Sequence, residues 1–301
     1  MQALAAYILR GPLQAGGMVG LFGLLSLVFP PSAYLSGGAV ALVTLRLGLS
    51  QGALSWLVAM LFAAAVCWLS LGSLRPVLAL VGGIWLPTWL LAPLLGVSRS
   101  QGVLLLGCCG LALLLALGFR LLVDDPVQWW SAWISDLLVV MLGEGRMPEA
   151  SQIAALAKLM TSLLAAGFTL NLMFNLLLGR WWQSLVANPG GFSTEFRQLR
   201  LPRGCAVVLI AASIVVALRG GLQEGGMVSD LLLVGIVAFT LQGLAVVHDY
   251  CARRPGGMAI LLTVYFVLFF TGLYGLMLVA LLGLADSLGD FRGLATGRTG
   301  Q

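Results

Sequence analysis

Charged residues are scarce in this sequence. Only 9% of its 301 residues are Asp, Glu, Lys or Arg, while hydrophobic residues make up 60%. Soluble domains usually carry about 25% charged residues. The mean hydropathy of +1.03 agrees with that deficit. A water-soluble enzyme is therefore excluded, and the composition predicts a protein that lies in a lipid bilayer.

Metal-binding and catalytic patterns are also missing. The chain has a single histidine and five cysteines, and no two cysteines have the Cys-x-x-Cys spacing. We therefore expect neither a zinc site nor a disulfide framework. There is no Walker loop, no His-Glu-x-x-His, no Gly-x-Ser-x-Gly and no pair of carboxylates within an apolar run. Because no nucleophile and base occur together, we expect a protein that is not an enzyme, with no catalytic residue and no cofactor.

A concentrated basic region is missing as well. The net charge is +5, but the 16 basic residues are spread over the loops rather than gathered on one domain. Nucleic-acid-binding domains usually show a basic patch or stripe. We therefore expect no nucleic-acid partner, and we interpret the basic residues as determinants of membrane topology.

Long apolar runs are what the sequence does contain. Each is close to the roughly 20 residues that a helix needs to cross about 30 Å of hydrocarbon, and none alternates as a barrel strand would. They predict an all-α polytopic membrane bundle of eight or nine transmembrane helices, forming one transmembrane domain over residues 1–301. The predicted spans are 12–29, 33–47, 51–71, 76–95, 101–122, 150–179, 204–219, 228–250 and 258–284. The last run is compatible with one long helix or with two short ones broken near Thr271-Gly272.

The distribution of charge in the loops predicts the orientation. The loop from Arg180 to Arg203 carries four arginines against one acid, whereas the loop from Asp124 to Glu149 carries five acids against Arg146. Lys and Arg are enriched in cytoplasmic loops. We therefore expect a multi-pass membrane protein with its amino terminus in the cytoplasm.

The acidic loop also contains a helix signal. Asp125-Pro126 is typical of an N-cap followed by proline in the first turn, and apolar residues then recur at helical spacing up to Met141. The segment 126–142 is predicted to be an amphipathic helix on the outer membrane surface, with Trp129, Trp130 and Trp133 in the aromatic belt. The alternatives for this segment are a packing element between two spans and, after it, a lid over an outward-facing cavity.

Polar side chains inside an apolar span are candidates for function because they are costly there. The run 150–179 holds five candidate ligand-binding residues, Lys158, Ser162, Thr169, Asn171 and Asn175. At 100° per residue the first three lie within roughly 40° of one another, and the two asparagines form a second stripe. The alternatives are hydrogen bonds between helices for the asparagines and snorkelling to the interface for Lys158.

The loop that follows combines tryptophan, phenylalanine and arginine. Its amphipathic spacing predicts an interfacial helix that holds anionic lipid headgroups or docks a cytoplasmic partner. The candidate partner- or lipid-binding residues are Arg180, Trp181, Trp182, Phe192, Phe196, Arg197 and Arg200.

These segments also carry a resemblance. The stretch Asn171-Leu-Met-Phe-Asn175, the run from Arg180-Trp-Trp to Asn188-Pro-Gly-Gly-Phe192, and Gly283-Leu-Ala-Asp286 with Asp290-Phe-Arg292 resemble the YybS-like family of bacterial polytopic membrane proteins. That family, filed as a domain of unknown function, is distantly similar to the substrate-binding S components of energy-coupling-factor transporters. The resemblance implies a small-molecule pocket that faces outside and docking on another membrane subunit.

Two hypotheses of function follow. The first is a non-enzymatic membrane protein, similar to S components, that binds or takes up a small solute or lipid from the outer side. The second is a scaffold that recruits cytoplasmic partners through the loop from Arg180 to Arg203. Membrane lipids are expected contacts under both hypotheses.

Overall fold

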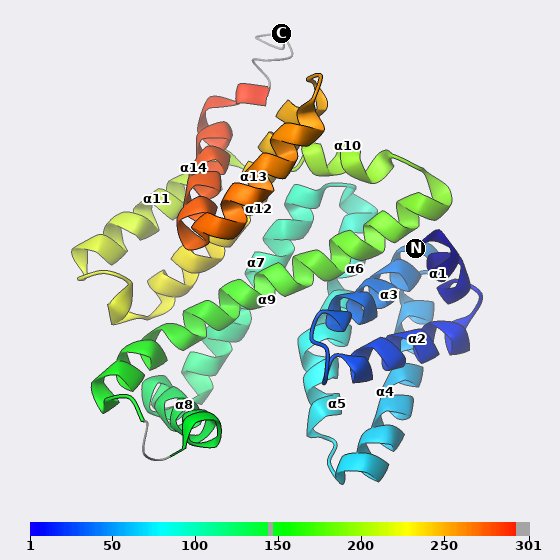
Figure 1. Ribbon diagram of the computed structural model, residues 1–301, viewed down its shortest axis with the longest axis horizontal. Helices are drawn as coiled ribbons and strands as arrows, with labels where there is room; N and C mark the ends of the chain where they lie inside the picture. Colours follow the sequence, from blue (N-terminus) through cyan, green and yellow to red (C-terminus); the bar gives the residue numbers. More distant parts are fainter. Residues whose placement is uncertain (144–146, 293–301) are drawn as a thin grey trace. The chain divides into compact units, whose positions relative to one another are not determined.

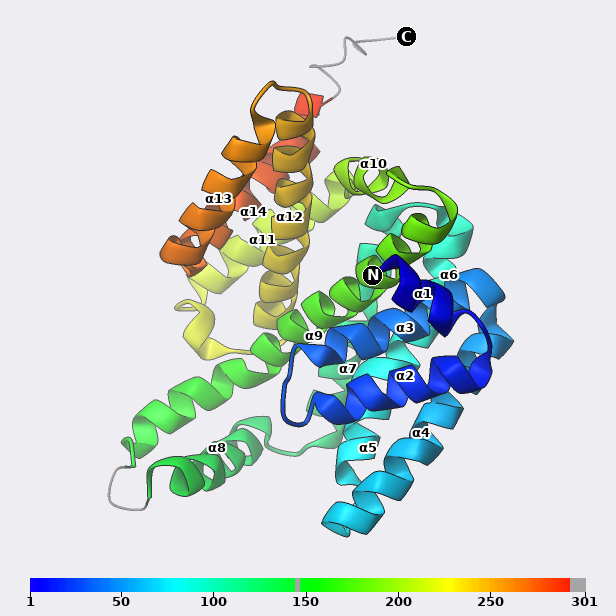
Figure 2. The same cartoon turned by 45° about the vertical axis from the view of Figure 1, so that its right-hand side comes forward.

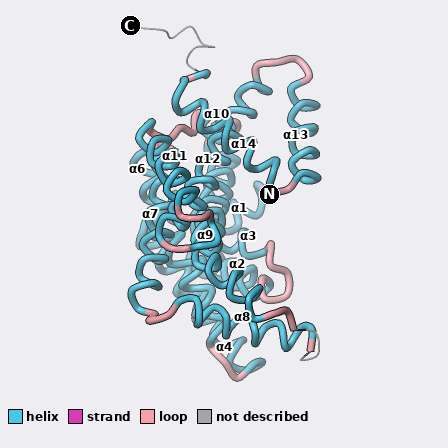
Figure 3. Tube along the Cα trace, turned by 90° about the vertical axis from the view of Figure 1, so that its left-hand side faces the viewer, coloured by secondary structure: helices cyan, strands magenta, loops and turns pink. Residues whose placement is uncertain are grey.

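The protein is built from helices. The computed structural model describes residues 1–143 and 147–292, and it contains no strand within those ranges, as Figure 3 shows. The expectation of an all-α membrane bundle is confirmed. Glu144 and Arg146, which the sequence places in the acidic loop, lie outside the described residues.

Five helical segments of the described chain are long and apolar enough to cross a membrane. Each coincides with a predicted span, because a continuous apolar run can bury all of its backbone polar groups in lipid only as a helix. They are α4 (Leu49–Leu71), the segment Arg75–Ser98, α7 (Gln101–Leu122), α9 (Ala150–Ala187) and α12 (Met227–Ala252). Five shorter apolar helices of 14–17 residues account for the other predicted spans: α2 (Pro12–Leu25), α3 (Ser32–Leu47), α11 (Arg203–Leu218), α13 (Gly257–Thr271) and α14 (Leu273–Gly289).

The backbone divides into two compact units, which we describe separately. The first comprises Met1–Cys108 and Leu170–Leu199, and the second comprises Cys109–Thr169 and Arg200–Gln301. Helix α9 therefore contributes its first part to the second unit and its last part to the first unit. The single transmembrane domain over residues 1–301 stays a prediction.

The first unit contains α1 to α6 (blue to cyan in Figure 1) and packs around buried tryptophans. A buried hydrogen-bond chain joins three of its segments: Trp85 Nε1 donates to Ser36 Oγ at 2.8 Å, and Ser36 Oγ donates to the Val19 carbonyl at 2.7 Å. The short helix α1 had no counterpart among the predicted spans. Besides α2, α3 and α4, this unit holds α1 (Gln2–Ile8), α5 (Arg75–Leu80), a π-helix (Val81–Trp85), α6 (Leu86–Ser98) and α10 (Gly191–Arg197).

The second unit ends in three helices that run up, down and up again. Figures 1 and 2 show α13 returning alongside α12 and α14 reversing once more, so that α12 and α14 end at the same end of this group. The reversal is at Gly272, whose φ of 53° and ψ of −122° suit glycine. The run 258–284 is therefore two helices, which was one of the two alternatives. This unit also contains α8 (Pro126–Leu142) and a 3-10 turn (Leu222–Glu224).

Two glycines allow α12 and α14 to approach closely. A Cβ atom on Gly243 would lie 1.9 Å from the Val279 carbonyl oxygen, and one on Gly283 would lie 2.1 Å from the Phe239 carbonyl oxygen. Both neighbours are backbone atoms, which cannot swing aside. Helices in lipid have no hydrophobic driving force for association. The close van der Waals packing that small residues permit stabilises such crossings instead.

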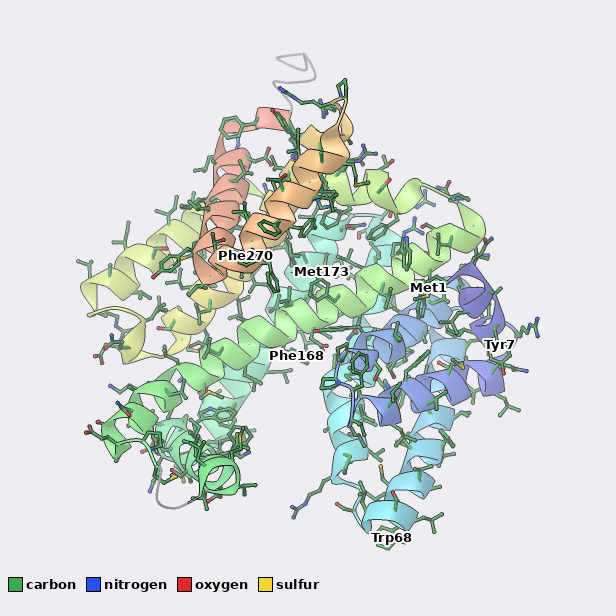
Figure 4. The ribbon with its side chains drawn as sticks, viewed as in Figure 1. Met1, Tyr7, Trp68, Phe168, Met173 and Phe270 are labelled. Atoms are coloured by element: carbon green, nitrogen blue, oxygen red, sulfur yellow. The ribbon has the colours of Figure 1, made fainter. Side chains whose placement is uncertain are left out.

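Large apolar side chains cover the outer faces of both units. Figure 4 labels Trp68 near the end of α4 and Phe270 near the end of α13, and these two side chains are 61% and 69% exposed. In a soluble protein such faces would drive aggregation. In a bilayer they are solvated by lipid, and aromatic rings near helix ends suit its interface.

The crossing of α12 and α14 gives a first prediction. Replacing Gly283 with alanine forces the two backbones apart, and we expect a loss of about 1–3 kcal/mol of stability from overpacking. Thermal unfolding of the detergent-solubilised protein measures the change. Gly118→Ala is the matched control, because nothing lies within 4 Å of a Cβ at that position. Equal melting temperatures for the two variants would contradict the tight crossing.

Candidate functional site

Three predicted ligand-binding residues on the first part of α9 have partners inside the second unit. Lys158 Nζ lies 4.0 Å from Glu224 Oε2, and both side chains are about half exposed. Ser162 Oγ donates to Asp230 Oδ1 at 2.5 Å, while Thr169 Oγ1 donates to the Ala165 carbonyl of its own helix at 2.9 Å. Ser162 and Thr169 are fully buried, so their hydroxyl groups serve helix packing here.

The two asparagines, on the last part of α9 in the first unit, differ from each other. Asn171 Nδ2 donates to the Gly83 carbonyl at 3.2 Å. Gly83 lies in the π-helix Val81–Trp85, so this bond connects α9 to the π-helix. Asn175 is completely buried against Gly37, and neither of its polar atoms has a hydrogen-bond partner among residues 1–143 and 147–292. Asn171 thus joins helices, whereas the role of Asn175 in ligand binding stays a prediction.

Ser162 is hydrogen-bonded to a buried ion pair that was not predicted from the sequence. Arg120 on α7 donates through Nε and Nη2 to the two carboxylate oxygens of Asp230 on α12, both at 2.8 Å. The Asp230 side chain is fully buried and that of Arg120 is 18% exposed. The available signal was the presence of opposite charges in two predicted spans, 101–122 and 228–250. Both carboxylate oxygens of Asp230 accept from Arg120, and one also accepts from Ser162, which indicates a structural connection among α7, α9 and α12.

The helix predicted at 126–142 is present as α8 and packs against α9, while its position on the outer membrane surface stays a prediction. The Asp125 carboxylate accepts a hydrogen bond from the Gln128 N–H at 2.9 Å, which confirms the N-cap. Trp130 is buried and donates from Nε1 to Thr161 Oγ1 at 3.0 Å, whereas Trp129 and Trp133 are almost half exposed. The helix is therefore a packing element on one face. A role as a lid over a cavity stays a prediction.

The predicted lipid-binding loop begins with an ion pair. Arg180 donates to both carboxylate oxygens of Glu195, in one case from Nε at 2.8 Å, and it also donates to Gln183 Oε1 at 2.6 Å. Trp181 packs against the core of the first unit, and Trp182 is fully buried in it. The ring of Trp182 therefore faces protein rather than lipid, and we leave it out of the candidate site.

The remainder of the loop forms α10. Phe192 and Phe196 stack with their ring centroids 6.2 Å apart, and Arg197 Nε donates to the Ser193 carbonyl at 3.0 Å. Arg200, which belongs to the second unit, forms an ion pair with Asp290. The amphipathic turn predicted from Phe192 onward is present, but it is only seven residues long.

A pocket of about 420 Å³ lies at the ends of α3, α6 and α9 in the first unit. We call it the basic pocket. Its apolar wall is formed by Leu45, Leu95 and Gly96, and its polar wall by Arg99, Arg180, Gln183, Asn188 and Glu195. Arg180 is the only predicted site residue that lines it. Arg99, which the sequence analysis treated only as a determinant of topology, is exposed and has no ionic partner among the described residues. This is the candidate functional site.

A protein-family model matches the second half of the chain. Residues 144–287 match the model of a family described as "Predicted membrane protein (DUF2232)". This part is similar to a membrane protein family. The match runs through most of α14, and its description names no activity. No curated protein and no solved structure matches the chain. The resemblance to the YybS-like family and to S components stays a prediction.

The buried ion pair gives a second prediction. Replacing Asp230 with leucine leaves the Arg120 charge unpaired at a site with little solvent, which we expect to cost about 3–5 kcal/mol. The double variant Asp230→Leu/Arg120→Leu removes both charges and should recover most of that loss. Thermal unfolding in detergent measures both variants. Glu224→Gln, which breaks the half-exposed pair with Lys158, should change stability by less than about 1 kcal/mol. A double variant no more stable than the single one would refute a purely structural pair.

Proposed function

We propose that the protein is a non-enzymatic component of the bacterial inner membrane that binds a small anionic solute, or the headgroup of an anionic lipid, in the basic pocket. One observation carries the proposal. Arg99 lies at the pocket with a positive charge that no described residue neutralises. An uncompensated cation beside a cavity is a ready partner for a carboxylate or phosphate.

The other lining residues set the kind of ligand. The charge of Arg180 is balanced by Glu195, so this pair contributes oriented donors and acceptors rather than net charge. Leu45 and Leu95 provide an apolar wall beside these polar groups. A ligand with an anionic end and an apolar portion matches both walls. Pockets for small molecules commonly combine an apolar lining with a few polar groups in this way.

The predicted topology places this pocket in the cytoplasmic half of the membrane, because both Arg99 and the loop from Arg180 to Arg203 belong to basic loops. The resemblance to S components implies capture from outside instead. We therefore propose that the ligand reaches the basic pocket from the cytoplasmic side or leaflet. An amino terminus in the cytoplasm is part of the same proposal.

Native mass spectrometry of protein purified gently from membranes tests the binding. We expect a retained anionic molecule on the wild type and about tenfold weaker retention on Arg99→Gln, since one charge-assisted hydrogen bond is worth about 1.5–3 kcal/mol. Arg46→Gln is the matched control, because Arg46 is an exposed arginine at the end of α3 that does not line the pocket.

The mass of the retained molecule decides between the two ligand sources. A phospholipid mass indicates a lipid site, and a mass outside the lipid range indicates a solute. If no retained species depends on Arg99, or if Arg46→Gln has the same effect, the proposed function is wrong.

A scaffold is the second candidate, and one observation favours it. The stacked rings of Phe192 and Phe196 on α10 are only partly buried, which leaves an aromatic face next to Arg197. Aromatic residues and arginine are enriched in protein interfaces. Such a face suits a cytoplasmic protein partner.

Substitution of both rings tests this candidate. We expect Phe192→Ser/Phe196→Ser to abolish co-purification of a protein partner after mild crosslinking, while Arg99→Gln leaves that partner bound. Quantitative mass spectrometry of the purified complexes measures the change. A crosslinked partner that survives the double substitution would rule out this face as the docking surface.

A further inference from the structure

The segment between α10 and α11 is held inside the second unit through the backbone of Leu201. The Leu201 N–H donates to Gln242 Oε1 on α12 at 3.0 Å, and its carbonyl accepts from Ser287 Oγ on α14 at 3.2 Å. Gln242 and Ser287 are both buried. Side chains from two helices therefore satisfy both backbone polar groups of Leu201, which fixes the neighbouring residues in place.

The same network continues to a buried carboxylate. Gln242 Nε2 donates to Asp286 Oδ2 at 3.0 Å, and Arg292 Nη2 donates to the same oxygen at 2.6 Å. The Asp286 side chain is fully buried and that of Arg292 is 6% exposed. The charge of Asp286 is thus neutralised from within the protein.

A cavity of about 160 Å³ opens beside this network. We call it the linker pocket. Its buried lining is Leu201, Gln242, Asp286 and Ser287, and its exposed lining is Arg200, Arg203 and Asp290. A single water needs only about 10–15 Å³ of such space. The cavity therefore has room for a polar group much larger than one water molecule.

The charges around the linker pocket do not cancel. Asp286 is paired with Arg292, and Asp290 is paired with Arg200. Arg203 has no ionic partner among the described residues. The lining itself holds two arginines and two aspartates, and Arg292, which lies outside the lining, neutralises Asp286, so this group of five charged residues keeps one excess positive charge. The pocket therefore favours an anion over a cation. Arg203 is also the first residue of α11, where the free N–H groups of the first helical turn reinforce the preference for an anion.

We propose that the linker pocket is a phosphate-binding site, which takes the phosphate of an anionic lipid headgroup or a free phosphate group. A phosphate offers several strong acceptor oxygens to arginine donors. Basic pockets between transmembrane helices bind phosphorylated headgroups in the same manner. The site lies wholly within the second unit, shares no residue with the basic pocket and does not depend on the function proposed above.

Arg203 is the residue to change, because it is exposed and its loss breaks no described ion pair. The full-length protein is reconstituted in nanodiscs or detergent, and phosphatidylglycerol adducts are counted by native mass spectrometry with phosphatidylcholine as the neutral reference. We expect Arg203→Gln to weaken phosphatidylglycerol retention about tenfold, which corresponds to the loss of one charge-assisted contact. Arg203→Lys, which keeps the charge, should restore part of the retention.

Arg254→Gln is the matched control, since Arg254 is an exposed arginine of the same unit that does not line the pocket. A second arm adds inorganic phosphate to lipid-depleted protein and records the melting temperature. A phosphate-dependent rise that Arg203→Gln removes identifies a free phosphate group as the ligand, whereas selective lipid loss alone identifies a headgroup. Unchanged behaviour of Arg203→Gln in both arms would overturn the proposal, as would an equal loss in Arg254→Gln. Arg99→Gln should leave both readouts unchanged, which separates this site from the basic pocket.

Discussion

The need to neutralise a buried carboxylate shapes the second unit. Asp230 and Asp286 are both withdrawn from solvent, and each is held by an arginine, Arg120 in one case and Arg292 in the other. An isolated charge at such a site is very costly, so each arginine must keep its place for the helices to stay together. The first pair connects α7 with α12, and the second fixes the residue just past α14 against that helix.

These pairs also determine where binding can occur. Polar groups near the ion pairs already form hydrogen bonds within the protein. Ser162 donates to Asp230, and Gln242 donates to Asp286. Such groups have little capacity left for a ligand. Among the described residues, uncompensated charge is found instead at helix ends, at Arg99 just after α6 and at Arg203, the first residue of α11, and each of these arginines borders a cavity. Function is therefore better sought at the ends of the helices than among the polar residues of α9.

The sequence predicted the helices well because lipid imposes one simple rule, the satisfaction of every backbone group within a helix. It could not choose between one helix and two at 258–284, since the turn depends on the conformation of Gly272 and on the packing of α14 against α12. The partners of the buried polar residues were equally out of reach. Asp230 and Ser162 are 68 residues apart, and no periodicity along the chain indicates such a contact.

Trp182 and Arg99 show what residue type alone leaves open in a site prediction. Tryptophan next to a basic loop is typical of the membrane interface, yet Trp182 is fully buried because that face of α9 packs into the first unit. In the sequence Arg99 is a topology signal, and the structure adds that this residue, with its left-handed backbone at the end of α6, lies beside a cavity. A basic residue that sets topology needs only to lie on the correct side of the membrane. Its position beside an apolar wall is an additional property, and that property is what a binding site requires.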